Sequence, residues 1–198
     1  MKIIIVGASG TLGKKITQDL QKDHEVIKVG TKTGDIQADI TDPDSIKKMF
    51  EKIGSFDALV CAAGGGHFGP LKDMTDADFR KGVDSKMMGQ INLVLIGQHY
   101  INPKGSFTLI TGVLSEDPVK NSVNLAAVNS AVNGFVKAAA LELENGVRIN
   151  AVSPGVVEDS PQLFDMFPGH KPVSMERVVY GFRKSVLGHV TGQVIKEV

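Results

Sequence analysis

The chain has 198 residues, of which 42% are hydrophobic, and its 22 basic and 22 acidic residues give a formal net charge of zero. This length is enough for one sizeable buried core, and the evenly mixed charge argues against a nucleic-acid-binding stripe or a polybasic membrane patch. The single cysteine, Cys61, excludes an internal disulfide and most cysteine-based zinc sites, so we expect no metal site.

The hydrophobic pattern alternates between short β-branched runs and longer segments with helical spacing. In chain order it predicts strand 2–6, helix 10–21, strand 25–29, helix 42–53, strand 58–62, helix 75–98, strand 106–111, helix 121–144, strand 147–152, helix 175–187 and strand 193–198. Either Thr41 or Asp42 caps the second helix. Strands that alternate with helices, without hairpin signals, indicate an α/β fold with one doubly wound parallel sheet covered by helices on both faces.

No repeat or linker divides the chain, so we expect residues 1–198 to form a single domain. The least regular stretch, residues 156–174, carries three prolines and is either a mobile lid over a site or a plain connection. No apolar run reaches the ~18 residues of a spanning helix, and the run at residues 3–6 is too short for the core of a signal peptide. We therefore expect a cytoplasmic protein without membrane or nucleic-acid partners.

A glycine-rich turn follows the first predicted strand directly and opens the first predicted helix. It reads Gly7-Ala8-Ser9-Gly10-Thr11-Leu12-Gly13. Glycines at such a turn let the backbone approach a pyrophosphate closely, while the start of the helix offers unpaired N–H groups and the positive end of its dipole. This context favours a dinucleotide-binding site over a tight turn without a ligand.

Four further segments carry recognisable motifs: Ala38-Asp39-Ile40, Cys61-Ala62-Ala63-Gly64, residues 131–143, and Ile149-Asn150-Ala151-Val152-Ser153-Pro154-Gly155. Together with the glycine turn they resemble the short-chain dehydrogenase/reductase family over nearly the whole chain. The resemblance implies a Rossmann fold and a nicotinamide cofactor. The cofactor-binding residues that it implies are Gly7, Ser9, Gly10, Thr11, Leu12, Gly13, Asp39, Ile40, Ala62, Ala63, Gly64, Asn129, Pro154, Gly155 and Val156.

The end of the second predicted strand bears on the choice of cofactor. An acidic residue there would accept the ribose 2′-hydroxyl of NAD, but this segment continues into Thr31 and Lys32. A cation and hydroxyls without a carboxylate suit a 2′-phosphate, so we expect NADP rather than NAD. The alternative is that Lys32 is an ordinary solvated loop residue.

The sequence departs from the family at all four positions of its catalytic group. The family transfers a hydride between nicotinamide and a carbonyl or alcohol, with a proton-donating Tyr, a Lys four residues later, an upstream Ser and an Asn in the preceding long helix. The corresponding residues here are Leu125, Asn129, Gly112 and Lys86. Leu125 has no proton to give, and Asn129 can bond a ribose hydroxyl but carries no charge.

Other side chains are candidates for the missing chemistry. Lys86 is expected to project toward the vacated site, where its ammonium could stabilise an oxyanion or donate a proton if burial lowered its pKa. Thr111 offers a hydroxyl, and His67 is an ionisable group near the expected cleft. Two Tyr-x-x-x-Lys strings, which begin at Tyr100 and Tyr180, are interpreted as unrelated to catalysis. The first spans Pro103 before a predicted strand and so does not lie on a helix face, and the second lies on the last predicted helix, where the family has no catalytic groups.

Three hypotheses follow. The first is an NADP-dependent oxidoreductase that acts on a small carbonyl or alcohol substrate, with a non-standard proton donor among Lys86, Thr111 and Asn129. The second is a catalytically silent NAD(P)-binding sensor or regulatory protein. The third is an isomerase or lyase that keeps the cofactor as a scaffold. In each case we expect a homo-oligomer, because helices 75–98 and 121–144 resemble those that pair between subunits in the family.

Overall fold

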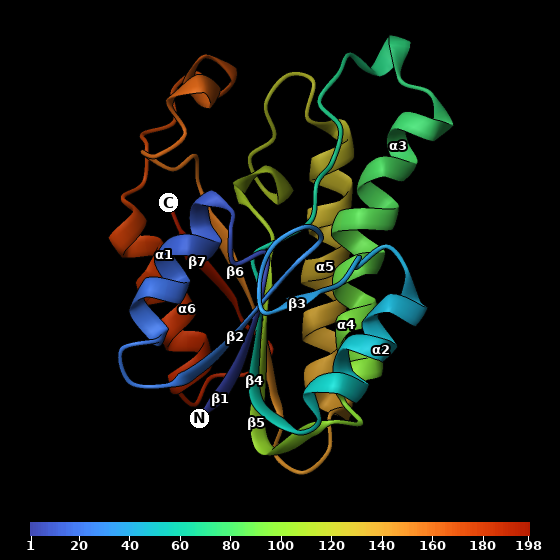
Figure 1. Ribbon diagram of the computed structural model, residues 1–198. Coiled ribbons are helices and arrows are strands. Elements are labelled where there is room, and N and C mark those ends of the chain that lie inside the picture. The colour runs from blue at the N-terminus through green and yellow to red at the C-terminus, as the bar shows by residue number, and fades with distance from the viewer.

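The computed structural model describes residues 1–198. Seven parallel strands form a single sheet in the order β3-β2-β1-β4-β5-β6-β7, which confirms the predicted fold class (Figure 1). The strands are β1 (Lys2–Val6), β2 (Glu25–Gly30), β3 (Ile36–Gln37), β4 (Phe56–Cys61), β5 (Ile101–Ile110), β6 (Arg148–Pro154) and β7 (Val194–Glu197). The order reverses between β1 and β4, and such a switch point opens a crevice at the carboxyl ends of the strands.

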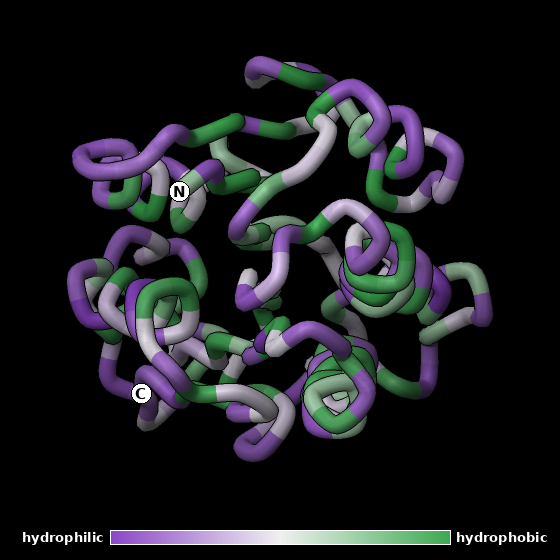
Figure 2. The backbone as a smooth tube through the Cα atoms, turned by 90° about the horizontal axis from the view of Figure 1, so that it is seen from below, coloured by the Kyte–Doolittle hydropathy of each residue, from purple (hydrophilic) through white to green (hydrophobic).

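Six α-helices cover the two faces of the sheet. They are α1 (Thr11–Leu20), α2 (Pro43–Ile53), α3 (Asp76–Gly82), α4 (Gly89–Gly97), α5 (Val123–Glu142) and α6 (Met175–Leu187). Figure 1 shows α1 and α6 on one face of the sheet and α2, α4 and α5 on the other. The tube in Figure 2 alternates between hydrophobic and hydrophilic colours along the helices, as expected when one side of each helix packs on a sheet. No helix is both long and apolar enough to cross a bilayer.

The core has one apolar layer on each side of the sheet. Phe50, Phe56 and Phe107 belong to the layer beneath α2, α4 and α5, and Ile16 and Phe182 to the layer beneath α1 and α6. Since side chains alternate along a strand, residues 3–6 of β1 point in turn into the two layers, and these four residues are almost fully buried. An apolar run of this kind is typical of a parallel sheet with two covered faces.

The predicted helix 75–98 forms in three consecutive pieces. Thr75 begins it with a reciprocal cap, accepting from the Asp78 N–H while the Asp78 side chain accepts from the Thr75 N–H. Residues Val83–Met88 between α3 and α4 form a π-helical segment, whose wider turn is a feature often found at functional sites. This segment contains Lys86.

The remaining differences from the sequence prediction are small. Asp42 caps α2 by accepting from the Asp44 N–H at 3.0 Å, which decides between the two proposed caps. β5 begins at Ile101 rather than at residue 106, and the two-residue strand β3 was not predicted. Each helix and strand that the pattern predicted is present, with ends shifted by a few residues.

Candidate active site

The glycine turn after β1 has the backbone that a pyrophosphate cradle requires. Gly7 has a φ of 81°, and a Cβ at this position would lie 2.8 Å from the carbonyl oxygen of Ala62, which follows β4. A Cβ at Gly13 would overlap the carbonyl oxygen of Gly7. Gly10 caps α1 without a side-chain acceptor, so no side chain competes for the first N–H groups of the helix. The turn therefore fits a bound pyrophosphate at the switch point of the sheet.

The loop after β4 lies directly against the π-helical segment. Gly64 has a φ of 114°, and a Cβ there would lie 2.9 Å from the Cα of Lys86. The neighbouring Gly65 N–H donates to the Ser85 hydroxyl at 3.1 Å. Cys61, at the end of β4, is fully buried, and this burial raises the pKa of its thiol to about 11. The loop thus carries Ala62, Ala63 and Gly64 to the edge of the crevice beside Lys86.

The residues expected around the adenosine lie at the other end of the crevice. Thr31 and Lys32 are exposed in the loop between β2 and β3, where the Lys32 carbonyl accepts from the Gln37 amide at 3.1 Å. Asp39 is exposed, and hydrogen bonds from the N–H and hydroxyl of Thr41 lower the pKa of its carboxyl. Ile40 is buried against Gly89. Between β2 and β3 the one cation is Lys32, and the first carboxylate after the end of β2 is that of Asp35.

A pocket of about 340 Å³ opens at the carboxyl ends of β1, β4, β5 and β6. It includes the four positions at which the sequence departs from the family: Lys86, Gly112, Leu125 and Asn129. Its other lining residues are Thr11, Leu12, Ala62, Phe68, Thr111, Val113, Leu114, Pro154, Gly155, Val156, Val157, Ser160, Leu163 and Phe167. The pocket therefore joins residues expected at the cofactor to those expected at the substrate.

Lys86 is the only titratable side chain that lines this pocket. It is 8% exposed, and no hydrogen bond or ion pair reaches its ammonium. Burial lowers the pKa of Lys86 from 10.5 to about 8, and a weak opposing effect comes from Cys61. The ammonium is thus still the main form at pH 7, but it is a better proton donor than an exposed lysine.

The buried side chain of Gln90 fixes the backbone around Lys86. Its amide donates to the Lys86 carbonyl at 2.7 Å and to the Ile110 carbonyl at 2.9 Å, while its oxygen accepts from the Ile110 N–H at 2.8 Å. These bonds tie the π-helical segment to the last residue of β5. Thr111 follows immediately, so Gln90 joins the backbone of Lys86 to that of the residue before Thr111, and both Lys86 and Thr111 line the pocket.

Two polar side chains in the pocket have no partner within the protein. The Thr111 hydroxyl and the Asn129 side-chain oxygen are buried and make no hydrogen bond. Buried polar atoms are almost always bonded, so each orphaned atom marks a place where a ligand group fits. Gly112 has an extended backbone, and a Cβ there would lie 3.4 Å from the Asn129 amide nitrogen, an ordinary contact. The missing serine is therefore not excluded by the fold.

Residues 156–174, here called the lid, extend beyond the carboxyl end of β6 (Figure 1, orange), and five of them line the pocket: Val156, Val157, Ser160, Leu163 and Phe167. Their ends are joined, because the Val173 N–H donates to Val156 at 2.8 Å and the Glu158 N–H to Val173 at 3.0 Å. Phe167 lines the pocket and meets Phe68 edge-on, with ring centroids 6.4 Å apart. This stretch therefore contributes a wall of the pocket, and its mobility stays a prediction. Phe68, Leu163 and Phe167 were not predicted as site residues, because only the folded lid brings them together.

The other candidates lie outside the pocket. His67 sits on the adjoining loop, with its Nδ1 3.9 Å from the Asp78 carboxylate, but it does not line the cavity. Tyr100 stacks on Phe50 in the core, with ring centroids 5.4 Å apart, and Tyr180 is 60% exposed on α6. Neither tyrosine can serve as the family's acid.

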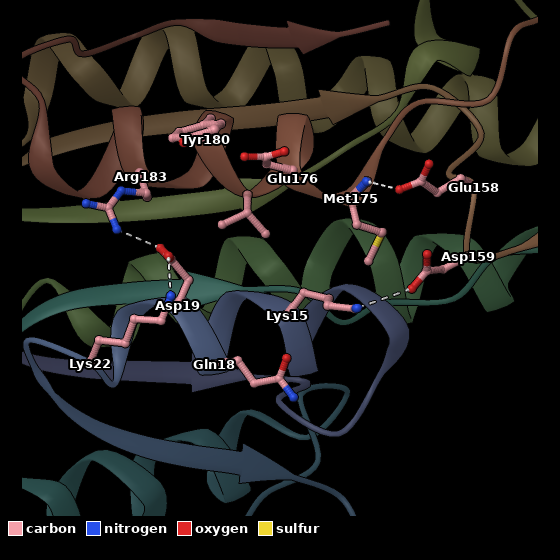
Figure 3. Close-up of a pocket in the computed structure, with 11 residues that line it drawn as sticks. Lys15, Gln18, Asp19, Lys22, Glu158, Asp159, Met175, Glu176, Tyr180 and Arg183 are labelled. Carbon is pink, nitrogen blue, oxygen red and sulfur yellow. Dashed lines mark hydrogen bonds and ion pairs between the residues drawn. The ribbon is translucent and has the colours of Figure 1, made fainter.

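A second, larger groove of about 790 Å³ runs between α1 and α6 (Figure 3). Its charged side chains pair with one another, as Arg183 does with Asp19 at 2.9 Å and Lys15 with Asp159 at 3.8 Å. It shares no lining residue with the pocket of Lys86. Several of its charges are therefore already paired with one another, and none of the residues predicted for the site lies in this groove.

Comparison with known proteins identifies the family of the chain. The family model described as Enoyl-(Acyl carrier protein) reductase matches residues 2–172. The chain belongs to the short-chain dehydrogenase/reductase family. It is thus an oxidoreductase of the short-chain type, from a family that binds nicotinamide cofactors.

Three relatives show the range of this similarity. The chain is 26% identical to the uncharacterized oxidoreductase YmfI of Bacillus subtilis over 90% of this chain and 83% of that protein. It is 46% identical to the crystal structure of lin1944 from Listeria innocua, with a TM-score of 0.99 over the whole of both chains. A small-chain dehydrogenase in complex with NADPH is 27% identical, with a TM-score of 0.89, over 99% of this chain and 95% of that one.

Proposed function

We propose that this chain is an NADP-dependent oxidoreductase that interconverts a small carbonyl compound and its alcohol, with Lys86 in the role that the family gives to tyrosine. The observation that carries the proposal is the buried, unpartnered ammonium of Lys86 in the same pocket as Pro154, Gly155 and Val156. The cation at Lys32 supports NADP over NAD. So does the relative solved in complex with NADPH.

The cofactor would be held by groups along the whole crevice. The N–H groups at the start of α1 would bind the pyrophosphate, and Lys32 the 2′-phosphate. The orphaned oxygen of Asn129 would accept a hydrogen bond from a ribose hydroxyl. When bound, the cofactor supplies or accepts a hydride.

In the reducing direction the carbonyl carbon receives the hydride, and negative charge develops on the oxygen. The Lys86 ammonium stabilises this charge and gives up a proton to complete the hydroxyl, while the Thr111 hydroxyl donates a second hydrogen bond. One carbonyl and one reduced cofactor are consumed, and neutral Lys86 regains a proton from water. The apolar side chains with which the lid lines the pocket lower the local polarity, which strengthens these electrostatic interactions.

The test measures NADPH consumption over a panel of small aldehydes and ketones. Replacing Lys86 by Met keeps the aliphatic stem and removes the charge, so kcat/KM falls by roughly 10²–10³ while NADPH binding persists. Binding can be followed by NADPH fluorescence, since the chain has no tryptophan. The matched control is Lys48→Met, an exposed lysine on α2, which leaves kcat/KM unchanged. Equal activity of the Lys86→Met variant and the parent protein would refute the role of Lys86.

A second candidate is a catalytically silent NAD(P)-binding protein. It is favoured by Leu125 and Gly112, which leave the pocket without the family's acid and its upstream hydroxyl. This candidate predicts tight NADPH binding and no turnover of any carbonyl compound. The same panel therefore separates the two functions.

A further inference from the structure

The pocket of Lys86 contains one positive charge and no negative charge to balance it. None of its lining residues is acidic. Cys61 is the one group that affects the pKa of Lys86 through its charge, and its thiol remains protonated until about pH 11. Asp84, on the same segment as Lys86, is exposed and acts on Arg80 instead. Buried cations are ordinarily paired, so the missing partner is expected to arrive with the ligand.

The elements packed around Lys86 confirm that the protein offers it no counter-charge. The end of β5 presents Thr111, α5 presents Leu125 and Asn129, and the lid presents Ser160, Leu163 and Phe167. All of these side chains are neutral. The ligand must therefore supply the anion itself.

The rest of the pocket limits the size and polarity of that ligand. At about 340 Å³ it lies at the small end of the ~300–1,000 Å³ typical of ligand sites, and part of it is lined by residues expected at the cofactor. Its roof is apolar and includes Leu114, Leu163 and Phe167. A short ligand with an apolar tail and one negative group fits these walls.

The ammonium of Lys86 would then have two roles. If the proposed function holds, Lys86 contacts the reacting carbonyl oxygen, and it must also neutralise the ligand's charge. A single ammonium, with its three N–H donors, reaches both groups when the carboxylate is on the carbon next to the carbonyl. We propose that the substrate is a short-chain 2-oxo acid, reduced to the 2-hydroxy acid, with both its carbonyl and its carboxylate oxygens on Lys86.

The orphaned polar atoms suit the same ligand. The Thr111 hydroxyl can donate to either oxygen of a 2-oxo acid, which would satisfy its missing bond. The step is that of the proposed function, on which this inference rests. The carbonyl carbon gains a hydride, its oxygen gains a proton, and one reduced nicotinamide cofactor is oxidised. The carboxylate is unchanged.

The probes for a test share the same ketone and differ in the group next to its carbonyl, which is negatively charged in one probe and neutral in the other two. They are 2-oxobutanoate, its neutral methyl ester and 2-butanone. The parent protein should consume NADPH with 2-oxobutanoate at a kcat/KM at least about 10²-fold above that with 2-butanone and above that with the ester, although the ester carbonyl is the more electrophilic. The preference disappears in the Lys86→Met variant and is kept in Lys86→Arg, which retains the charge.

A binding measurement gives a readout that does not depend on turnover. In calorimetry at pH 8 with NADP⁺ present, 2-oxobutanoate binding should take up about half a proton, because pairing raises the pKa of Lys86 from about 8. The proton count comes from repeating the titration in buffers of different ionisation enthalpy. The ester takes up no proton, and neither does 2-oxobutanoate with Lys86→Arg.

The outcomes separate this inference from the proposed function. A preference for 2-oxobutanoate with proton uptake supports both. Reduction of the ester and ketone as efficiently as the acid, without proton uptake, overturns the 2-oxo acid and leaves the oxidoreductase proposal standing. Binding of the acid with proton uptake but no NADPH consumption supports the ligand class and overturns the proposed catalysis. Neither binding nor turnover of any probe overturns both.

Discussion

Replacing Lys86 by Met should make the protein more stable at pH 7 even though it removes the proposed catalytic group. Lys86 is 8% exposed and its ammonium has no partner within the protein, so folding removes much of the water around this charge without a compensating anion. Lowering the pKa of Lys86 from 10.5 to about 8 corresponds to about 3 kcal/mol, at ~1.4 kcal/mol for each tenfold change in the acid constant. Met fills nearly the same space and carries no charge, so most of this cost is relieved.

The stabilisation by Lys86→Met is largest at neutral pH and decreases as the pH rises. Between about pH 8 and 10.5 the unfolded chain holds a proton on Lys86 that the folded protein has lost. Because the unfolded state binds more protons, the free energy of unfolding of the parent protein rises with pH across this window. The variant lacks this dependence, so its advantage of up to about 3 kcal/mol at pH 7 shrinks toward zero near pH 10.5. The Cys61 thiol also titrates at high pH, but it is common to both proteins.

The assays are thermal unfolding and urea unfolding of the cofactor-free protein at pH 7 and at pH 10. At pH 7 the variant's melting temperature should rise by about 6–12 °C, at ~2–4 °C per kcal/mol for a chain of this size. Lys48→Met, on the exposed side of α2, should change the free energy of unfolding by less than ~0.5 kcal/mol at both pH values. If Lys86→Met is destabilising at pH 7, or if its effect is the same at both pH values, the ammonium is not buried unpaired and the reasoning fails.

Three other predictions test the cofactor, the pocket and the assembly. NADPH should bind more tightly than NADH by fluorescence titration, and Lys32→Glu should reverse that order; an unchanged order would remove Lys32 from the cofactor site. The quadruple variant Lys86→Asn, Gly112→Ser, Leu125→Tyr, Asn129→Lys, which restores the family's four residues and leaves one cation in the pocket, should raise carbonyl reduction by roughly 10²-fold or more in an NADPH assay, because the backbone leaves room for the serine; no gain would indicate a pocket unfit for substrate. In sedimentation velocity the protein should run as a homo-oligomer, and a single 21.1 kDa species in dilute solution would contradict this.

The fold could be predicted because its signals are local. The β-branched run of β1, the glycines that follow it and the spacing of apolar residues on α6 each lie within a few residues of one another. Only part of the site could be predicted from the sequence. The alignment of motifs placed Lys86, Gly112, Leu125 and Asn129 at equivalent positions, and all four line one pocket.

What the sequence did not reveal depends on contacts between distant residues. The π-helical turn around Lys86 is held by Gln90, which bonds to Ile110 at the end of another element. The lid becomes a roof only through the packing of Phe167 on Phe68, about a hundred residues earlier in the chain. β3 has two residues and pairs only with β2, so no periodic pattern marks it. These features could not be predicted from short stretches of sequence, because each depends on residues that are far apart in the chain or on too few residues to form a pattern.

The four departures from the family are physically coupled. In the family's arrangement a tyrosine hydroxyl and a lysine ammonium from one helix would make this pocket polar and positively charged. Here Leu125 packs with the apolar roof, and Asn129 adds no charge beside Lys86. An apolar wall is what lowers the pKa of a buried ammonium, and a second cation nearby would lower it further and compete for the same anion. In this proposal Lys86 both binds the anion and donates the proton. It can do so because α5 carries the neutral residues Leu125 and Asn129 where the family has tyrosine and lysine.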